Sequence, residues 1–341
     1  MWVTKGQDKA IRIMSSALRT DRVSHAYLIS GPEHVGKTTF ALDIARAVNC
    51  QSADIELVPC GDCSQCKRIS SMVHTDVFLY DIQPSKDDSN LPTRAVTIDS
   101  LREDFISQVY KKPFEGKARV FIISAVEKMR SEQANVLLKT LEEPPDDTVI
   151  ILLSEQIGGI VETIVSRCQI INLNPVSHRF LEKYIREFLP DFEMCDSAEI
   201  ARLSKGRIGW VNNVVTDDTI MVSRNGLLDI YGNIITDDID ERLEVASKLA
   251  ERLRRSYNSD GEELDIWMTF WRDILLIKSG RPGEVANLSR TEVLERLSNK
   301  LSVSEITLSI KLISSFVSYL DLNVSPRLAL DNLMLKLPRV S

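Results

Sequence analysis

The feature that most constrains this chain is a glycine-rich segment at residues 31–38, with the sequence GPEHVGKT. It matches the phosphate-binding pattern G-x-x-x-x-G-K-[ST] at every fixed position, and it lies between an apolar run at residues 26–29 and a helical pattern at residues 38–48. Backbone N–H groups and the positive end of the following helix hold the anion in such loops, so a strand must precede the loop and a helix must follow it. The segment therefore predicts an α/β nucleotide-binding domain.

Each fixed position of this loop has an expected role in binding ATP or ADP with Mg²⁺. Gly31 and Gly36 let the backbone turn around the phosphate oxygens, while Lys37 reaches the β- and γ-phosphates. The Thr38 hydroxyl is expected to ligate Mg²⁺, and Thr39 is a further candidate contact. The alternative interpretation is a glycine-bearing turn that binds nothing.

Hydrolysis of the nucleotide is not expected to be strong. In P-loop ATPases an acidic residue usually follows a later strand, but here the run at residues 119–123 leads into Ser124 and Ala125. Neither side chain can hold a divalent cation or activate water as a carboxylate does. Glu127 comes two to three residues too late and is expected to point elsewhere. The sequence predicts a nucleotide binder with weak or absent hydrolysis.

Two kinds of pattern divide the chain. From residue 25 to residue 173, short apolar runs alternate with helical patterns, which indicates a parallel sheet covered by helices. Strands are expected at residues 26–29, 77–80, 119–123, 149–153 and 169–173, and helices at residues 38–48, 98–108 and 131–143. After residue 175 only helical patterns remain, at residues 180–189, 197–203, 210–215, 241–254, 263–277, 291–301, 306–320 and after Pro326.

Three domains are therefore predicted. Residues 1–174 form the α/β nucleotide-binding domain, residues 175–215 a small helical domain, and residues 216–341 a larger all-helical domain. The length of 341 residues agrees with two or three domains.

Four of the six cysteines lie within one short segment, residues 50–66. Cys50, Cys60, Cys63 and Cys66 contain two overlapping C-x₂-C steps, which lets four thiolates converge on a tetrahedral ion. Because sulfur would fill every position, the predicted role is a structural Zn²⁺ site. An iron–sulfur cluster and a set of ordinary reduced thiols are the alternatives, and Cys168 and Cys195 are expected to be plain thiols.

Composition excludes several classes of protein. A hydrophobic content of 43% with 14 glycines and 12 prolines excludes collagen-like and disordered chains. The formal charge of −7 argues against a protein that wraps nucleic acid by bulk charge. The polar start and the short apolar runs predict no signal peptide and no membrane segment, so a reducing, cytoplasmic location is expected.

Several motifs together resemble a known family. They are HAYL at residues 25–28, the cysteine segment after the P-loop helix, NVLLKTLEEPP at residues 135–145, TIVSRC at residues 163–168 and PRLALD at residues 326–331. The chain resembles the delta-prime subunits of bacterial DNA polymerase III clamp loaders, which are AAA+ proteins. The resemblance covers nearly the whole length and implies an AAA+ domain, a helical lid and an all-α collar.

The resemblance also implies partners and a role for Arg167. Such subunits act in a five-subunit ring with gamma/tau-like motor subunits and a delta-like subunit, and the ring loads the sliding clamp on primed DNA. In that family, the arginine at the position of Arg167 reaches the γ-phosphate bound by a neighbouring subunit. A guanidinium there stabilises the transferring phosphoryl group. Without the resemblance, Arg167 would be read as a solvated side chain.

Departures from the family's motor subunits favour a stator over a motor. Motor subunits have an Asp-Glu pair where this chain has Ser124 and Ala125, and an arginine near the position of Gly209, although Arg207 is close. Ser154 lies near the family's polar sensor position. The alternatives are an autonomous gamma/tau-like ATPase and a P-loop kinase or repair ATPase whose cysteines bind nucleic acid.

Two further features have ordinary interpretations. The basic residues between the second and third expected strands and beyond are interpreted as a solvated rim, with a surface facing DNA as the alternative; they are Lys111, Lys112, Lys117, Arg119, Lys128 and Arg130. Trp267 and Trp271 have helical i, i+4 spacing and are expected to pack in a core or between subunits.

Overall fold

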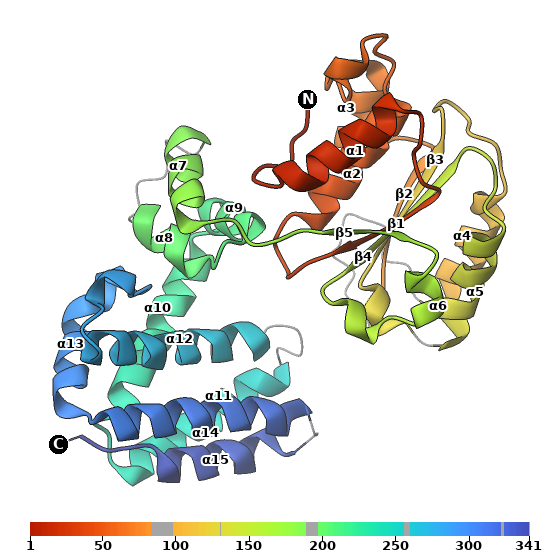
Figure 1. Cartoon of the computed structure of the whole chain (residues 1–341). Helices are drawn as coiled ribbons and strands as arrows, with labels where there is room; N and C mark the ends of the chain where they lie inside the picture. The colour runs from red at the N-terminus through yellow and green to blue at the C-terminus, as the bar shows by residue number, and fades with distance from the viewer. Residues whose placement is uncertain (83–97, 130, 189–196, 256–259, 322–323, 341) are drawn as a thin grey trace. The chain divides into compact units, whose positions relative to one another are not determined.

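The computed structural model describes residues 1–82, 98–129, 131–188, 197–255, 260–321 and 324–340 (Figure 1). The chain forms two compact units. The first, unit 1, contains Met1–Leu181 and Lys205–Trp210, and the second, unit 2, contains Glu182–Ser204 and Val211–Ser341. The division into three domains at residues 174 and 215 remains a prediction.

A parallel five-stranded sheet in the order β2-β3-β4-β1-β5 forms the centre of unit 1. Its strands are β1 (Ala26–Ser30), β2 (Val77–Asp81), β3 (Arg119–Ser124), β4 (Thr148–Ser154) and β5 (Gln169–Asn172). All five expected strands are confirmed, to within a residue at most ends. β1 lies between β4 and β5, with Ala26 opposite Ile150 and Tyr27 opposite Gln169.

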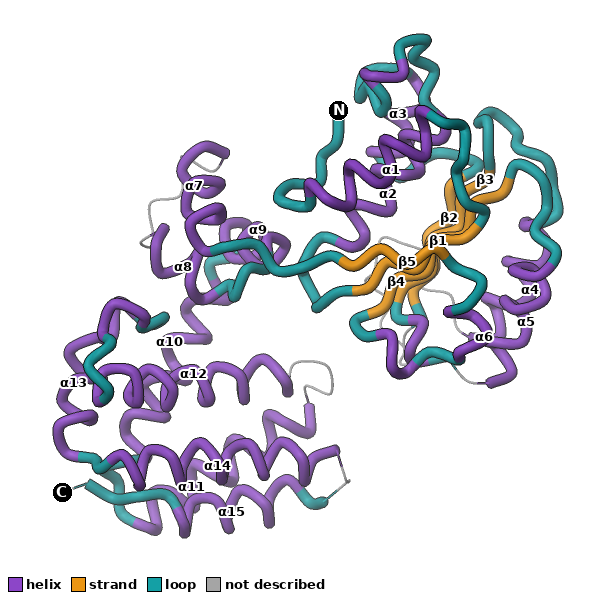
Figure 2. The backbone as a smooth tube through the Cα atoms, viewed as in Figure 1, coloured by secondary structure: helices purple, strands orange, loops and turns teal. Residues whose placement is uncertain are grey.

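Helices cover both faces of this sheet. Figure 2 shows α1 (Asp8–Arg19), α2 (Lys37–Asn49) and α3 (Ser64–Ser70) on one side of the strands, with α4 (Ile98–Val109), α5 (Ser131–Glu142) and α6 (Glu162–Val165) on the other. Tyr27 and Ile29 of β1 pack with Phe40 of α2, whereas the alternate residue Leu28 packs with Leu137 of α5. Both faces of the sheet are therefore buried, as the unbroken apolar runs predict.

Unit 2 consists of helices among its described residues. They are α7 (His178–Phe188, partly in unit 1), α8 (Ser197–Leu203), α9 (Ile208–Thr216, partly in unit 1), α10 (Thr219–Ile234), α11 (Ile239–Arg255), α12 (Asp260–Lys278), α13 (Thr291–Lys300), α14 (Val303–Asp321) and α15 (Pro326–Lys336). Every helix expected from the sequence is confirmed where it is described, while α1, α3, α6 and α10 were not predicted.

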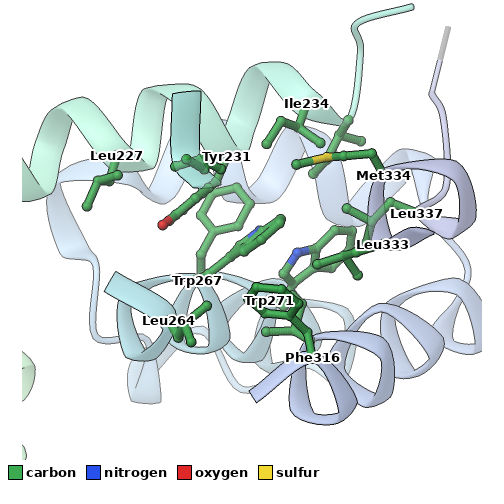
Figure 3. Close-up of a cluster of buried hydrophobic side chains, with 14 of the residues drawn as sticks. Leu227, Tyr231, Ile234, Leu264, Trp267, Trp271, Phe316, Leu333, Met334 and Leu337 are labelled. Atoms are coloured by element: carbon green, nitrogen blue, oxygen red, sulfur yellow. The ribbon is translucent and has the colours of Figure 1, made fainter. Parts of the chain in front are cut away.

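The two tryptophans of α12 lie in the core of unit 2. Trp267 is 1% exposed and stacks on Tyr231 of α10 with ring centroids 4.7 Å apart, while Trp271 is fully buried (Figure 3). Phe316 of α14 and Met334 of α15 belong to the same cluster. This confirms the core-packing interpretation of the tryptophan pair.

Helix α14 is the one candidate membrane span in the described part of the chain. Its segment Val303–Leu320 is long and apolar enough to cross a membrane by length and composition, with a mean hydropathy of 1.3. Ile306, Ile313 and Phe316 of this helix pack into the core of unit 2. A core helix of a soluble protein can also meet the criteria of length and composition, so the finding is weak evidence for a membrane span. The expected absence of a membrane segment remains a prediction.

Candidate functional site

The predicted phosphate-binding loop has the local structure that its chemistry requires. It leaves β1 at Ser30, and the N–H of Gly31 donates to the carbonyl of Ser154 at the end of β4 (3.1 Å). Gly36 has φ 102°, a left-handed value that favours glycine, and it caps α2, which begins at Lys37. The loop therefore lies at the carboxyl end of the sheet, with the positive end of α2 behind it.

The ammonium group of Lys37 is held inside this loop. Its Nζ donates to the carbonyls of Gly31 (2.6 Å) and Pro32 (2.9 Å). Burial lowers the pKa of Lys37, whereas the carboxylates of Glu155, Glu127 and Glu33 oppose that change. The lysine is thus positioned at the centre of the candidate anion site.

The other predicted nucleotide contacts surround the lysine. Thr38 is exposed and Thr39 is half-buried in the first turn of α2. Ser154 ends β4 directly opposite Ser30, but it is 1% exposed and its hydroxyl donates to the carbonyl of Gln156 (2.7 Å). The structure brings Ser154 beside the loop, with its hydroxyl engaged in a local turn.

Three carboxylates near Lys37 were not predicted as part of this site. Loss of hydration and the Glu33 carboxylate raise the pKa of Glu155, which also interacts with Lys37 and Glu127. The carboxylate of Glu127 acts electrostatically on both Lys37 and Glu155, whereas the expectation that it points elsewhere remains a prediction. Ala125 has a left-handed backbone (φ 56°) directly after β3, and Glu127 follows in the 3₁₀ turn η2 (Val126–Lys128).

Gly209 contacts the loop through its backbone. Its N–H donates to the carbonyl of His34 (2.7 Å), and a Cβ on Gly209 would lie 2.9 Å from that oxygen. A side chain at this position would force the loop to move. At the position where motor subunits are expected to have an arginine, this chain thus has a glycine whose backbone packs against the loop.

Arg167 follows α6 on the same unit. Its side chain is 35% exposed, and it pairs with Glu142, the last residue of α5. Its neighbour Cys168 packs against the core cluster under α5, and burial raises the pKa of Cys168 to about 11. Cys168 is therefore an ordinary protonated thiol, while Cys195 lies outside the described residues.

The four predicted metal ligands come together in space. The Sγ atoms of Cys50, Cys60, Cys63 and Cys66 all lie within 4.8 Å of one another, and those of Cys60 and Cys66 are 4.0 Å apart. Tetrahedral zinc with bonds of about 2.3 Å places its sulfurs about 3.8 Å apart, so the donor set fits this ion.

Backbone N–H groups surround these sulfurs. The N–H groups of Cys60, Cys63 and Cys66 each donate to a cysteine sulfur at 3.4 Å. The bond from Cys63 holds the pKa of Cys60 down to about 6, whereas burial raises the pKa of Cys66 to about 12. Donors aimed at sulfur are typical of sites built for thiolates.

The basic stretch does not form one surface. Arg119 is 6% exposed and pairs with the buried carboxylate of Asp76. Lys111, Lys112 and Lys117 are exposed before β3 begins, whereas Lys128 is exposed after β3 ends. Arg130 lies outside the described residues. The solvated-rim interpretation fits the exposed lysines but not Arg119.

The fold defines the class of this protein. The phosphate-binding loop leaves β1, an internal strand of the sheet, where the chain order of the sheet reverses, and the described residues after the sheet form helices and loops only. A glycine-rich loop between a buried parallel strand and a helix makes unit 1 an α/β domain of the P-loop class.

The chain belongs to the family described as DNA polymerase III, delta subunit, whose model matches residues 6–177. DNA polymerase III subunit delta' of Bacillus subtilis (strain 168) is 30% identical over 271 residues, which are 78% of this chain and 71% of that protein.

Gamma and tau subunits are similar as well. DNA polymerase III subunit gamma of Buchnera aphidicola subsp. Acyrthosiphon pisum (strain APS) is 31% identical over 54% of this chain and 48% of its own length. DNA polymerase III subunit tau of Bacillus subtilis (strain 168) is 24% identical over 98% of this chain and 61% of its own length. The chain spans less than two thirds of these two relatives.

Solved structures resemble the chain at low identity. A DNA polymerase III gamma subunit-related protein from Thermotoga maritima has a TM-score of 0.40 and 17% identity, covering 94% of this chain and 97% of its own. The Holliday junction branch migration motor RuvB of Thermotoga maritima has a TM-score of 0.41 and 16% identity, covering 87% of this chain and 89% of its own.

Proposed function

We propose that this protein is the stator subunit of a bacterial clamp loader. It binds ATP or ADP with Mg²⁺, hydrolyses it weakly or not at all, and supplies Arg167 as a trans arginine finger to a neighbouring ATPase subunit. Its partners are gamma/tau-like motor subunits and a delta-like subunit in a hetero-pentamer, which loads the sliding clamp on primed DNA. A cytoplasmic location follows from this role.

The observation that carries the proposal is the half-exposed side chain of Arg167 on a unit that has Ser124 and Ala125, in place of an acidic pair, at the end of β3. Arg167 follows the short helix α6, which Ile164 anchors in the core, so a neighbouring subunit can reach a side chain that starts from a fixed backbone. The delta', gamma and tau relatives are all subunits of DNA polymerase III, which supports assembly with such partners.

Nucleotide binding rests on the P-loop geometry. Gly31, Gly36 and Lys37 would hold the phosphates, and Thr38 would face Mg²⁺ with Thr39 beside it. Ser154, at the end of β4 opposite Ser30, is the proposed polar sensor beside them. The ion would supply positive charge to the phosphates when bound.

The cysteine cluster supports a structural zinc ion. Cys50, Cys60, Cys63 and Cys66 would fill all four positions of a tetrahedral site, which leaves none for a substrate. Cys50 follows α2 directly and Cys66 lies within α3, so the ion would fix the cysteine segment against the P-loop helix.

The proposal is tested by replacing Arg167 in the reconstituted clamp loader. We expect Arg167→Ala to lower DNA-stimulated ATP turnover at least about tenfold, because arginine fingers contribute about 10³–10⁵ in rate in comparable systems and other sites of the ring retain theirs. Arg12→Ala, on the exposed side of α1, is the matched control. Unchanged turnover and clamp loading with Arg167→Ala would refute the finger assignment.

The second candidate function is an autonomous motor subunit, and the position of Glu127 near Lys37 favours it. If Glu127 replaced the missing acidic pair, the purified chain would hydrolyse ATP on its own, and Lys37→Ala would abolish that activity. We expect the purified chain to bind nucleotide with little turnover. Robust hydrolysis sensitive to Lys37→Ala would establish the motor instead.

A further inference from the structure

The guanidinium of Arg167 is held by two groups of its own chain. Its Nη2 donates to Oε1 of Glu142 (2.7 Å), and its Nη1 donates to the carbonyl of Thr163 (3.0 Å). A carboxylate and a carbonyl thus engage one N–H of each terminal nitrogen and hold the guanidinium in one orientation. A bidentate contact with a phosphate also needs two guanidinium N–H groups. The contact with Glu142 therefore competes with the contact that a trans finger must make.

The surroundings of this pair allow the side chain to move while its backbone stays fixed. Glu142 ends α5, and α6, which carries Thr163, packs against α5. Ile164 of α6 and Leu141 of α5 are 1% and 2% exposed in the same core cluster. The side chains of Arg167 and Glu142 are 35% and 52% exposed, so the pair faces solvent above this buried core.

We propose that Glu142 is a latch that holds Arg167 away from phosphate until a neighbouring nucleotide site competes for it. This inference rests on the proposed function and adds the regulation of the finger. Glu142 touches neither nucleotide nor substrate, so it is a positioning residue that acts through Arg167.

The physical chemistry of the pair suits a reversible latch. Exposed ion pairs are weak, and a γ-phosphate with several charged oxygens attracts a guanidinium more strongly than one carboxylate does. The carboxylate of Glu142 also lies at the negative end of α5, where the helix dipole disfavours it. Removing its charge is therefore expected to leave the fold intact, so that a functional change reports the latch.

The test is Glu142→Gln in the reconstituted complex, with ATP turnover measured without DNA and without clamp. The amide keeps the shape of the side chain but loses its charge. We expect basal turnover to rise about two- to fivefold, the range set by the strength of an exposed ion pair, while DNA-stimulated turnover changes less. Unchanged or lowered basal turnover would overturn the latch.

The adjacent residue provides a matched control. Glu143→Gln removes the same charge from the same helix end, one position further along, and is expected to leave basal turnover unchanged. An equal rise with Glu143→Gln would show a general charge effect at the end of α5 and would overturn the specific role of Glu142.

A double substitution separates failure of the latch from failure of the finger. In an Arg167→Ala background, Glu142→Gln should have no effect, because the residue that it releases is absent. If Arg167→Ala itself leaves stimulated turnover unchanged, the finger fails. If Arg167→Ala lowers turnover but Glu142→Gln acts equally in both backgrounds, only the latch is overturned.

Discussion

Asp76 illustrates how one buried carboxylate holds a loop in place. It is fully buried and accepts the backbone N–H groups of Phe114, Glu115 and Gly116 at 2.8–3.0 Å, with the guanidinium of Arg119 beside it. Burial opposes ionisation, but these donors together hold the pKa of Asp76 below its ordinary value of 3.8. The loop before β3 is therefore anchored by charge-assisted hydrogen bonds.

We expect Asp76→Asn to lower the free energy of unfolding of unit 1 by about 2–4 kcal/mol, because an amide nitrogen would face buried donors and Arg119 would lose its partner. Urea unfolding followed by circular dichroism measures this. Asp146→Asn, an exposed residue after α5, is the control.

The lowered pKa of Asp76 also sets a pH dependence. Because the folded pKa lies below the unfolded one, the stabilisation is present above the ordinary value of 3.8 and is lost as the pH falls through the folded pKa. The difference between the wild type and Asp76→Asn should therefore shrink in acid. A difference that does not vary with pH would contradict the assigned role of the carboxylate.

At the scale of elements, the apolar pattern of the sequence predicts best the strands and helices that are buried on every side. β1 and β4 are buried along their whole length, so their apolar runs are unbroken and their limits could be predicted to within one residue. Helix α10 contains Gly226 and Gly232, which weaken a helical pattern, and it was missed. Helix α6 has only four residues, too few for a periodic pattern.

The candidate site could be predicted only where its residues are neighbours in sequence. The P-loop and the cysteine segment are local patterns, and both were predicted. Glu155 and Glu127, which follow β4 and β3, act electrostatically on Lys37, and Gly209 contacts His34 from a segment far along the chain. The proximity of these residues depends on the order of the strands in the sheet and on the left-handed turn at Ala125. Neither can be deduced from the spacing of residues in the sequence. One feature of the sequence could have indicated Glu155 as a site residue, namely its position just after an expected strand.

The ends of β1, β3 and β4 collect negative charge around the phosphate site, and that charge should weaken nucleotide binding. We expect Glu155→Gln to raise the affinity for a fluorescent ADP analogue about three- to tenfold near neutral pH, because one carboxylate near the phosphates is removed. Fluorescence titration of the purified chain measures this. Glu162→Gln, at the start of α6, is the control.

The pH dependence of that effect has a defined sign. The pKa of Glu155 is raised above its ordinary value of 4.5, so Glu155 loses its charge at a higher pH than an ordinary glutamate. As the pH falls, the wild type should approach the affinity of Glu155→Gln, at a higher pH than an ordinary glutamate would require. Weaker binding by Glu155→Gln would contradict the repulsive role and indicate that Glu155 helps to hold Mg²⁺.

At the scale of the whole molecule, all four proposed zinc ligands belong to unit 1, whereas Trp267 and Trp271 lie in the core of unit 2. We expect zinc removal to lower the thermal midpoint of unit 1 and to leave that of unit 2 unchanged, because metal-binding energy stabilises only the unit that holds the ion. Tryptophan fluorescence of a Trp2→Phe, Trp210→Phe variant reports unit 2, and circular dichroism reports both units.

Two further measurements complete this test. Cys66→Ser should lose about one zinc per chain, while Cys168→Ser should retain it, as elemental analysis can show. Absence of zinc from protein purified without chelator would contradict the site. A shift of both units on zinc removal would contradict the separate stability of the units.

The place of β1 between β4 and β5 has a consequence during synthesis of the chain. Residue 26 pairs with residue 150, and residue 27 pairs with residue 169, so the strand that carries the P-loop has neither neighbour when it is made. At about 5–20 residues per second, the ribosome needs roughly 6–25 s to reach its first partner. Throughout that time the backbone N–H and C=O groups of an apolar strand have no partner strands. Chaperones recognise exposed apolar segments of this kind.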